Sequence, residues 1–483
     1  MADVEFRTAT YTHAHHLSLR TLTWTTLAIT AVMGGLFFAL GFPPTFDTFY
    51  EKMYFHSIGI GIAALLCYLM LESFGLEAYE PPIDFPLRYR AFIAVVFGAL
   101  GGLLAINSSV WANLPDVGML FFVVAFILVV DVGGALFVEL LLLPRKQAGN
   151  YRGDSRNVIG YVGRLLPLRP EERAAYRGLT SAYWLAIISL ASAGVAAMIG
   201  FVNLWVRAFG PSFFGGYLGW LGLDANGFLG ATLDPHSHMI ALAIFAGIVA
   251  VAIPQFRACA PGAGARRNLV RVGAWIAIVG VIGTTLILSA VAFLNFAPPT
   301  LFQGGPGGAN GMAGDDAVMS IIFIGALVVA AGILADPESR RHGLRLAVVG
   351  TWAATVVITA VEGFWIEFHE DTFQAAQKAN DAAFSAAHPM TGIFVLTTLS
   401  LVLLLVDAHA TDQFARRLAA SVGVIGLVAA FAGTTFWTFV DPSNSGPSYW
   451  LYIVGIAVCY LAVLAGGLVI RSVRTAAPTA TMP

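Results

Sequence analysis

Residues 234–253 read Asp-Pro-His-Ser-His-Met-Ile-Ala-Leu-Ala-Ile-Phe-Ala-Gly-Ile-Val-Ala-Val-Ala-Ile. Two histidines, His236 and His238, open an apolar run of the length that a helix needs to cross a bilayer, roughly 20 residues. A histidine at membrane depth is costly unless it is paired or bound to something. The stretch therefore predicts a membrane helix that begins with a functional group.

The same arrangement occurs at two other places, in Phe-His-Ser-Ile-Gly around His56 and in Ala-His-Pro-Met-Thr around His388. With His238 these make three histidines at matching points of three apolar runs. Neutral imidazole is a good ligand for haem iron and for copper. Three matched imidazoles thus predict a metal or haem site inside a helical bundle, although a histidine at a helix start can also be an interfacial or hydrogen-bonded residue.

The whole chain has the composition of an integral membrane protein. It has 483 residues, of which 58% are hydrophobic and 11% charged, and a mean hydropathy of +0.78. We predict an all-α protein with a single membrane domain over 21–473, a cytoplasmic tail over 1–20 and a disordered tail over 474–483. The net charge of -2 gives no indication of nucleic-acid binding. The three cysteines are far apart and lack a Cys-x-x-Cys spacing, which argues against a disulfide framework or a cysteine metal site.

About twelve transmembrane helices are expected, and the basic residues orient them. Lys and Arg gather in the tails and in the loops after even-numbered helices, and only Lys52, Arg207 and Lys378 fall on the other side. Because positive residues favour the cytoplasmic side, both termini are expected to be cytoplasmic, with the histidines towards the outer leaflet of the cell membrane. The predicted helices cover 21–41, 53–72, 90–108, 117–143, 180–206, 236–254, 270–295, 317–335, 344–366, 386–407, 417–439 and 448–470.

These helices divide into three pseudo-symmetric sets of four. The first helices of the sets contain Gly-Gly-Leu-Phe-Phe at 34–38, Ile-Gly-Phe-Val-Asn at 199–203 and Glu-Gly-Phe-Trp-Ile at 362–366. The second helix of each set carries the histidine near its start. Membrane proteins often bury functional sites at the interfaces of such repeats. A polar, alanine-rich segment over 367–387 is expected to form a short helix lying over the bundle.

His236 and His238 cannot share one metal comfortably. They are two residues apart, so on a helix their side chains point about 200° apart. They are expected either to serve neighbouring sites, or to divide the roles so that one of them caps the helix after Asp234-Pro235.

Three acids at membrane depth, Asp131, Glu139 and Glu362, are the candidates for a proton path, because intramembrane ionisable groups usually face the interior. Asp131 and Glu139 are eight residues apart, which predicts that both lie near one face of their helix. The alternative for each is a structural hydrogen bond to a neighbouring side chain or to the backbone.

On these residues the chain resembles the catalytic subunit of the haem-copper oxidase superfamily, of the cytochrome oxidase and nitric oxide reductase type. That subunit has twelve helices in three pseudo-symmetric sets. Its helix 2 carries a low-spin haem ligand, its helix 6 a copper ligand and its helix 10 haem ligands. His56 matches the first position, His236 or His238 the second and His388 the third. The resemblance implies a haem held between helices 2 and 10 by His56 and His388.

The chain also departs from that family. Its helix over 270–295 lacks the histidine pair that completes the family's copper site, the His-Pro-Glu-Val-Tyr pattern is absent from 236–254, and no His-x-His pair opens 386–407. A full copper-containing oxygen-reducing centre is therefore not expected. Membrane haem and copper proteins linked to nitric oxide tolerance share the helix number and scattered histidines.

The resemblance implies a membrane haem protein with a b-type haem, which transfers electrons or binds or reduces a diatomic gas such as nitric oxide or oxygen. Copper or non-haem iron at His236 and His238 is a further expectation. The chain has no Cys-x-x-Cys-His motif, so an electron-donor protein or a quinol is the expected partner, and further membrane subunits are a second expectation. Two alternatives stay open: a proton-coupled transporter that uses Asp131 and Glu362, and a non-catalytic oxidase-like subunit of a respiratory complex.

Overall fold

The computed structural model describes twelve ranges of the chain, and their secondary structure is entirely helical. Eleven helices are long and apolar enough to cross a membrane, and Thr21–Leu36 is a shorter apolar helix. The prediction of an all-α membrane protein is confirmed. Both tails, the loop over 148–180 and most of the segment over 367–387 lie outside the described residues, which are 21–36, 49–74, 81–106, 114–147, 181–209, 211–258, 265–296, 314–362, 383, 387–410, 412–443 and 446–472.

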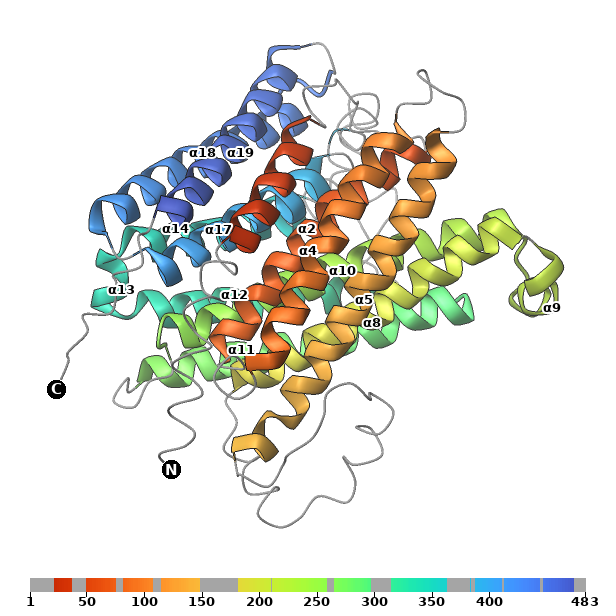
Figure 1. Cartoon of the computed structure of the whole chain (residues 1–483), viewed down its shortest axis with the longest axis horizontal. Coiled ribbons are helices and arrows are strands. Elements are labelled where there is room, and N and C mark those ends of the chain that lie inside the picture. The colour runs from red at the N-terminus through yellow and green to blue at the C-terminus, as the bar shows by residue number, and fades with distance from the viewer. Residues whose placement is uncertain are drawn as a thin grey trace, which may run out of the picture.

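Figure 1 shows the helices as one bundle, with α9 at its edge. Two segments, η1 and η3, have π-helical hydrogen bonding, and each runs directly into or out of an α-helix. The elements are α2 (Phe49–Ser73), α4 (Pro81–Ala105), α5 (Leu114–Gln147), α8 (Ser181–Phe209), α9 (Pro211–Leu221), α10 (Ala225–Gln255), α11 (Ala265–Leu294), α12 (Gly314–Leu334), α13 (Pro337–Arg341), α14 (Gly343–Val356), η1 (Val357–Val361), η3 (His388–Val395), α17 (Leu396–His409), α18 (Gln413–Phe439) and α19 (Pro447–Ser472).

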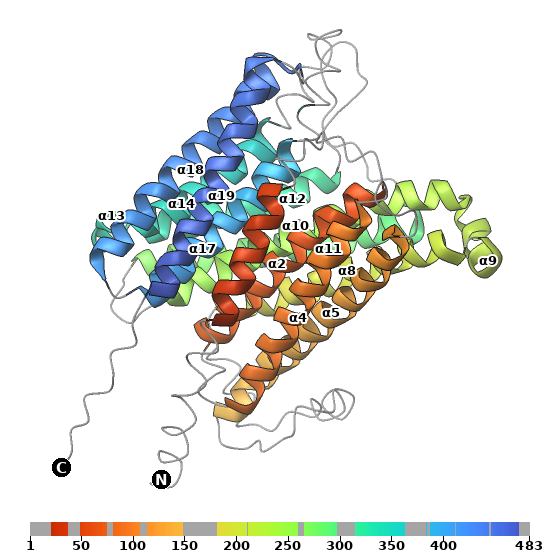
Figure 2. The same cartoon turned by 45° about the horizontal axis from the view of Figure 1, so that its top comes forward.

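Helix α10 begins eleven residues before the predicted start at 236. Its cap is Asp224, whose Oδ1 accepts the backbone N–H of Gly227 at 2.6 Å. Pro235 consequently lies inside the helix, and neither His236 nor His238 is a capping residue. The extra turns of α10 lead back to α9, which was not predicted as a helix and projects from the bundle in both views (Figures 1 and 2).

The three helices that carry the histidines form the centre of the bundle. Helices α2, α10 and α17 contact one another, and η3 also contacts α2. In the most apolar stretch of each of these three spans, 78% of the residues are buried for α2, 78% for α10 and 89% for α17. In the other eight candidate spans the buried share of that stretch is 28% to 56%. The histidines are therefore carried by the helices that are most shielded from lipid.

The third and fourth helices of each set form a tight outer hairpin built on glycine. A Cβ placed on Gly118 of α5 would lie 2.7 Å from the carbonyl oxygen of Gly101 in α4. One placed on Gly273 of α11 would lie 2.7 Å from the carbonyl oxygen of Gly325 in α12. A Cβ on Gly433 of α18 would meet the carbonyl oxygen of Leu451 in α19 at the same distance. Small residues let membrane helices approach this closely, and such a glycine contact is present in each of the three sets.

A buried ion cluster ties three helices together at the end of the bundle opposite the histidines. Arg88 Nη1 of α4 donates to Glu72 Oε1 of α2 at 2.9 Å, and His409 Nε2 of α17 lies 3.1 Å from Glu72 Oε2. The Arg88 side chain is 1% exposed, and the Tyr68 hydroxyl donates to its backbone carbonyl at 3.0 Å. Helices α2 and α17 are thus fixed to each other far from their histidines.

Candidate functional site: two histidine pairs on one helix

The structure brings four histidines together as two pairs. The rings of His56 on α2 and His236 on α10 have centroids 5.9 Å apart and planes inclined by 15°. The rings of His238 on α10 and His388 at the start of η3 have centroids 6.2 Å apart and planes inclined by 19°. His56 and His388 were expected to hold one haem between them, and here α10 supplies each of them with a histidine ring partner.

The position of α10 explains this arrangement. Two residues of an α-helix differ by about 200° in direction and by about 3 Å along the axis. His236 and His238 therefore leave α10 on opposite sides and at nearly the same depth. Since α10 contacts α2 and the helix that continues η3, one histidine meets each neighbour. The geometry corresponds to the expectation that the two residues serve neighbouring sites.

His236 is held in one orientation by helix α8. Its Nδ1 lies 2.7 Å from the carbonyl oxygen of Ala196. A carbonyl can only accept, so Nδ1 carries the hydrogen and Nε2 keeps its lone pair. Histidines that bind metals commonly donate their other ring N–H to a backbone carbonyl in this way. One turn further along α8, a Cβ on Gly200 would lie 2.5 Å from His236 Cε1, so only glycine leaves room for this ring.

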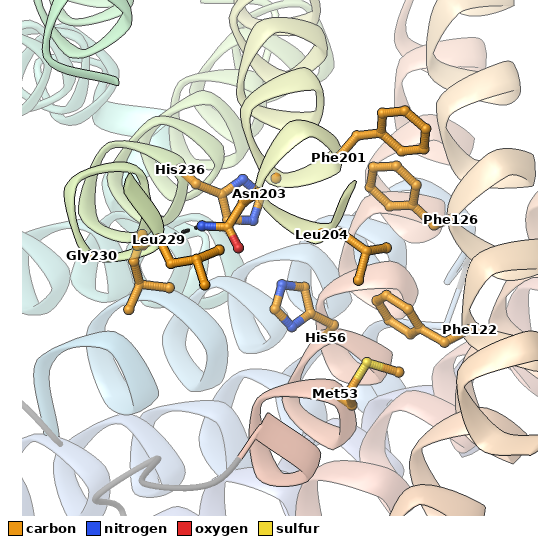
Figure 3. Close-up of a pocket in the computed structure, with 12 residues that line it drawn as sticks. Met53, His56, Phe122, Phe126, Phe201, Asn203, Leu204, Leu229, Gly230 and His236 are labelled. Atoms are coloured by element: carbon orange, nitrogen blue, oxygen red, sulfur yellow. Dashed lines mark hydrogen bonds between the residues drawn. The ribbon is translucent and has the colours of Figure 1, made fainter. Parts of the chain in front are cut away.

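A cavity of ≈ 330 Å³ lies beside the first pair, and both of its imidazoles line it (Figure 3). His56 is exposed towards it and meets the edge of the Phe122 ring at 5.6 Å. The volume is at the lower end of the range for small-molecule sites, roughly 300–1,000 Å³. Apart from the imidazoles, the wall is nearly all apolar: Met53, Phe122, Phe126, Gly200, Phe201, Asn203, Leu204, Leu229, Gly230 and Leu233.

Asn203 is the polar exception in that wall. Its Nδ2 donates to Thr232 Oγ1 at 2.7 Å and to the carbonyl oxygen of Leu229 at 3.2 Å. Both partners lie on α10, Thr232 one turn and Leu229 two turns before His236. The amide therefore joins α8 to α10 and fixes the segment that carries the imidazole.

The ligand set fits a metal that brings most of its own ligands. Among the described residues, no three His, Cys, Asp or Glu side chains gather as a metal-binding group. A protein zinc ion usually has four ligands, so two imidazoles alone do not complete such a site. A metal–imidazole bond is about 2 Å long, and the distance from ring nitrogen to ring centre adds about 1 Å. Two imidazoles on opposite sides of one metal ion thus have centroids about 6 Å apart, as both pairs do. A haem supplies four nitrogens of its own, so it would need only two imidazoles from the protein, the number that each pair offers.

The three predicted acids lie in different environments. Asp131 is on the periphery, where its side chain is 47% exposed and its Oδ2 accepts from Arg90 Nη1 at 2.6 Å. Glu139, eight residues later, is 3% exposed. Asp131 therefore lies outside the buried face that holds Glu139, and the prediction that both acids lie near one face is wrong: eight residues turn a helix by about 80° beyond two full turns. Glu362 is 4% exposed and accepts from the Thr435 hydroxyl at 2.6 Å. Only Glu139 and Glu362 therefore lie in the interior expected for a proton path.

Sequence reasoning missed the residues that shape the first site, namely the Ala196 carbonyl, Gly200 and the phenylalanines of the cavity. One signal for them was present. Residues 199–203, noted as part of the repeat, supply Gly200, Phe201 and Asn203 to the cavity wall. No protein family, curated protein or solved structure matches the chain, so the site rests on its own geometry.

Proposed function

We propose that this protein is a membrane haem protein that transfers electrons, with one haem site at His56 and His236 and a second at His238 and His388. The observation that carries the proposal is the pair of near-parallel imidazole couples, with centroids 5.9 Å and 6.2 Å apart, that meet on α10. A haem bound at either couple would supply a one-electron redox centre. With no covalent attachment motif in the sequence, the haem would be of the b type.

The residues around the first couple have definite roles under this proposal. The Ala196 carbonyl fixes the tautomer of His236 so that Nε2 is available to a metal. Gly200 leaves space for the ring, and Phe122, Phe126 and Leu204 exclude water from the cavity. Low solvent access and hydrogen bonding to the ligands are the means by which a protein sets the potential of a haem.

Electron transfer is favoured over gas chemistry because each couple would hold a haem through two protein imidazoles. A haem held by two side chains would supply one-electron transfer without any movement of His56, His236, His238 or His388. A relationship to the haem-copper oxidase superfamily is part of this proposal, and it rests on the histidine positions and on the central place of the second helix of each set. The electron donor would be a quinol or a redox protein.

The number of haems per chain tests the proposal. Purified protein is expected to contain two haems, with reduced-minus-oxidised spectra typical of bis-histidine b-type centres. The variants His236→Ala and His388→Ala should each lose one haem and keep the other. His342→Ala, on a connection between α13 and α14 far from both couples, is the matched control and should keep both.

A folded protein without haem would contradict the proposal. It would favour either a proton-coupled carrier, with the buried Glu362 as its coupling acid, or a metal-free oxidase-like subunit. Loss of both haems in His236→Ala alone would contradict the assignment of two separate sites.

A further inference from the structure

Glu362 is a buried acid at the histidine end of the bundle. It follows η1 directly and is 4% exposed. Its Oε1 accepts from Thr435 of α18 at 2.6 Å, while Oε2 is buried and has no hydrogen-bond partner within the described part of the chain. A carboxylate is costly to bury without a counter-charge, whereas a protonated carboxyl is far less so.

No described side chain near Glu362 supplies that counter-charge. The described elements that pack against η1 are α14, η3 and α18, and their titratable side chains are Arg345, His388, Arg416 and Arg417. Arg345 precedes Glu362 by 17 residues, and Arg416 precedes Thr435 by 19 residues, so the arginines lie roughly 25 Å away along their helices. Since none of the arginines reaches Glu362, a proton is the cation best suited to this carboxyl.

Two threonine hydroxyl contacts lie close together where α18 meets the π-helical segments, one at Glu362 and one on η3. Thr434, beside Thr435 on α18, has its hydroxyl oxygen 2.8 Å from that of Thr391 on η3 and 2.8 Å from the carbonyl oxygen of Ala430. A hydroxyl has one hydrogen, so Thr434 can direct it to either partner. Thr391 is three residues after His388, on the same π-helical segment. Hydroxyls that can reverse their hydrogen bonds are suited to passing a proton.

The two π-helical segments also meet directly. A Cβ on Gly392 of η3 would lie 2.5 Å from Thr359 Cγ2 of η1, and the Thr355 hydroxyl donates to the Gly392 carbonyl at 3.1 Å. A single close junction between η1 and η3 therefore lies between Glu362 and His388. Glu362 directly follows η1, and His388 begins η3. π-helical turns inside α-helices occur frequently at functional sites.

We propose that Glu362, with Thr435, is a proton-binding site coupled to the His238–His388 couple. Its carboxylate takes up one proton from the aqueous phase at the histidine end when one electron arrives at that couple from a one-electron donor, and it releases the proton when the electron leaves. The carboxyl O–H bond forms as an O–H bond of a hydronium ion in the aqueous phase breaks, and the reverse exchange occurs on release. This inference rests on the proposed haem function.

The test uses the two midpoint potentials of the purified holoprotein, titrated at several pH values. In the unmodified protein, one potential is expected to depend on pH and the other, that of the His56–His236 site, to serve as an internal control. Glu362→Gln should abolish the pH dependence, and Thr391→Val should slow proton uptake. Thr397→Val is the matched control, because Thr397 is a buried threonine that follows η3 and its hydroxyl donates only to backbone carbonyls.

Infrared difference spectra give a second readout that does not depend on turnover. Reduction should produce a carboxylic-acid band in the unmodified protein and in Thr397→Val, and Glu362→Gln should lack it. Two bound haems whose potentials do not depend on pH, or a pH dependence that survives Glu362→Gln, would overturn this inference and leave the haem function standing. A protein without haem would overturn both. If Glu362→Gln does not fold, Thr391→Val and the infrared band of the unmodified protein carry the test.

Discussion

At the scale of single residues, the first histidine couple depends on a glycine that touches it. Gly200 leaves room for the His236 ring, whose Nδ1 lies 2.8 Å from where a Cβ would be placed. We expect Gly200→Ala to push the ring away and to break its hydrogen bond to Ala196. The haem content of the purified variant should fall from two per chain to one, measured as pyridine haemochrome against protein.

Gly194→Ala is the control for this substitution. It lies on the same helix, and a Cβ there would meet nothing within 4 Å. It should retain both haems. If Gly200→Ala also retained both with unchanged spectra, the space at Gly200 would have no role in placing His236.

The sequence singled out the histidines of the two pairs but not which of them lie side by side. Matching positions in three apolar runs singled out His56, His238 and His388, and the 200° between His236 and His238 separated those two. Which helix lies beside which is a property of lateral packing, and hydropathy carries no information about it. The carbonyl that orients His236 belongs to Ala196, a residue whose side chain gives no signal.

At the scale of helices, the glycine contacts of the outer hairpins predict where the bundle is least tolerant of change. A Cβ on Gly325 of α12 would collide with the backbone of α11, at Ala277 N and at the Gly273 carbonyl oxygen, 2.7 Å away. Neither backbone atom can move without separating the helices. We expect Gly325→Ala to lower the free energy of unfolding by about 1–3 kcal/mol, the usual cost of overpacking.

Thermal unfolding in detergent measures this effect, and Gly133→Ala is the comparison. Gly133 lies inside α5, and nothing is within 4 Å of a Cβ placed there. Alanine is the better helix former, so that variant should be as stable as the parent or slightly more so. Equal stability of the two variants would argue against close backbone contact between α11 and α12.

Helices as such were largely predictable, whereas their ends were not. Long apolar runs mark the spans, but α10 begins at Ala225, well before its run becomes continuously apolar. The residues from 225 to 235 include Asn, Thr, Asp and Pro, which a hydropathy window treats as a loop. A tertiary contact from Asn203 of α8 and a local cap at Asp224 hold them in a helix.

At the scale of the whole molecule, the charge pattern predicts which end of the bundle faces the cytoplasm. Asn226, near the start of α10, and Arg340, between α12 and α14, are both exposed and lie at opposite ends by that rule. Single cysteines placed at these positions can be labelled in intact cells with a membrane-impermeant maleimide. Asn226→Cys should react and Arg340→Cys should react only after lysis.

The native cysteines need not react in this labelling experiment. Cys67 and Cys459 are buried, and Cys259 can be replaced by serine in the parent. The reverse labelling pattern would invert the assigned orientation, and it would place the proton exchange of Glu362 on the cytoplasmic side.

The shared helix has a consequence for energetics. His236 and His238 are separated by only about 3 Å along α10, so the two proposed redox centres lie side by side in the plane of the bilayer instead of one above the other. A charge that crosses the full membrane potential gains or loses about 2.3 kcal/mol per 100 mV. An electron exchanged between these centres moves across almost none of that potential, so their internal equilibrium would be insensitive to voltage. Any work against the field would then fall to proton movements or to the step that brings the electron in.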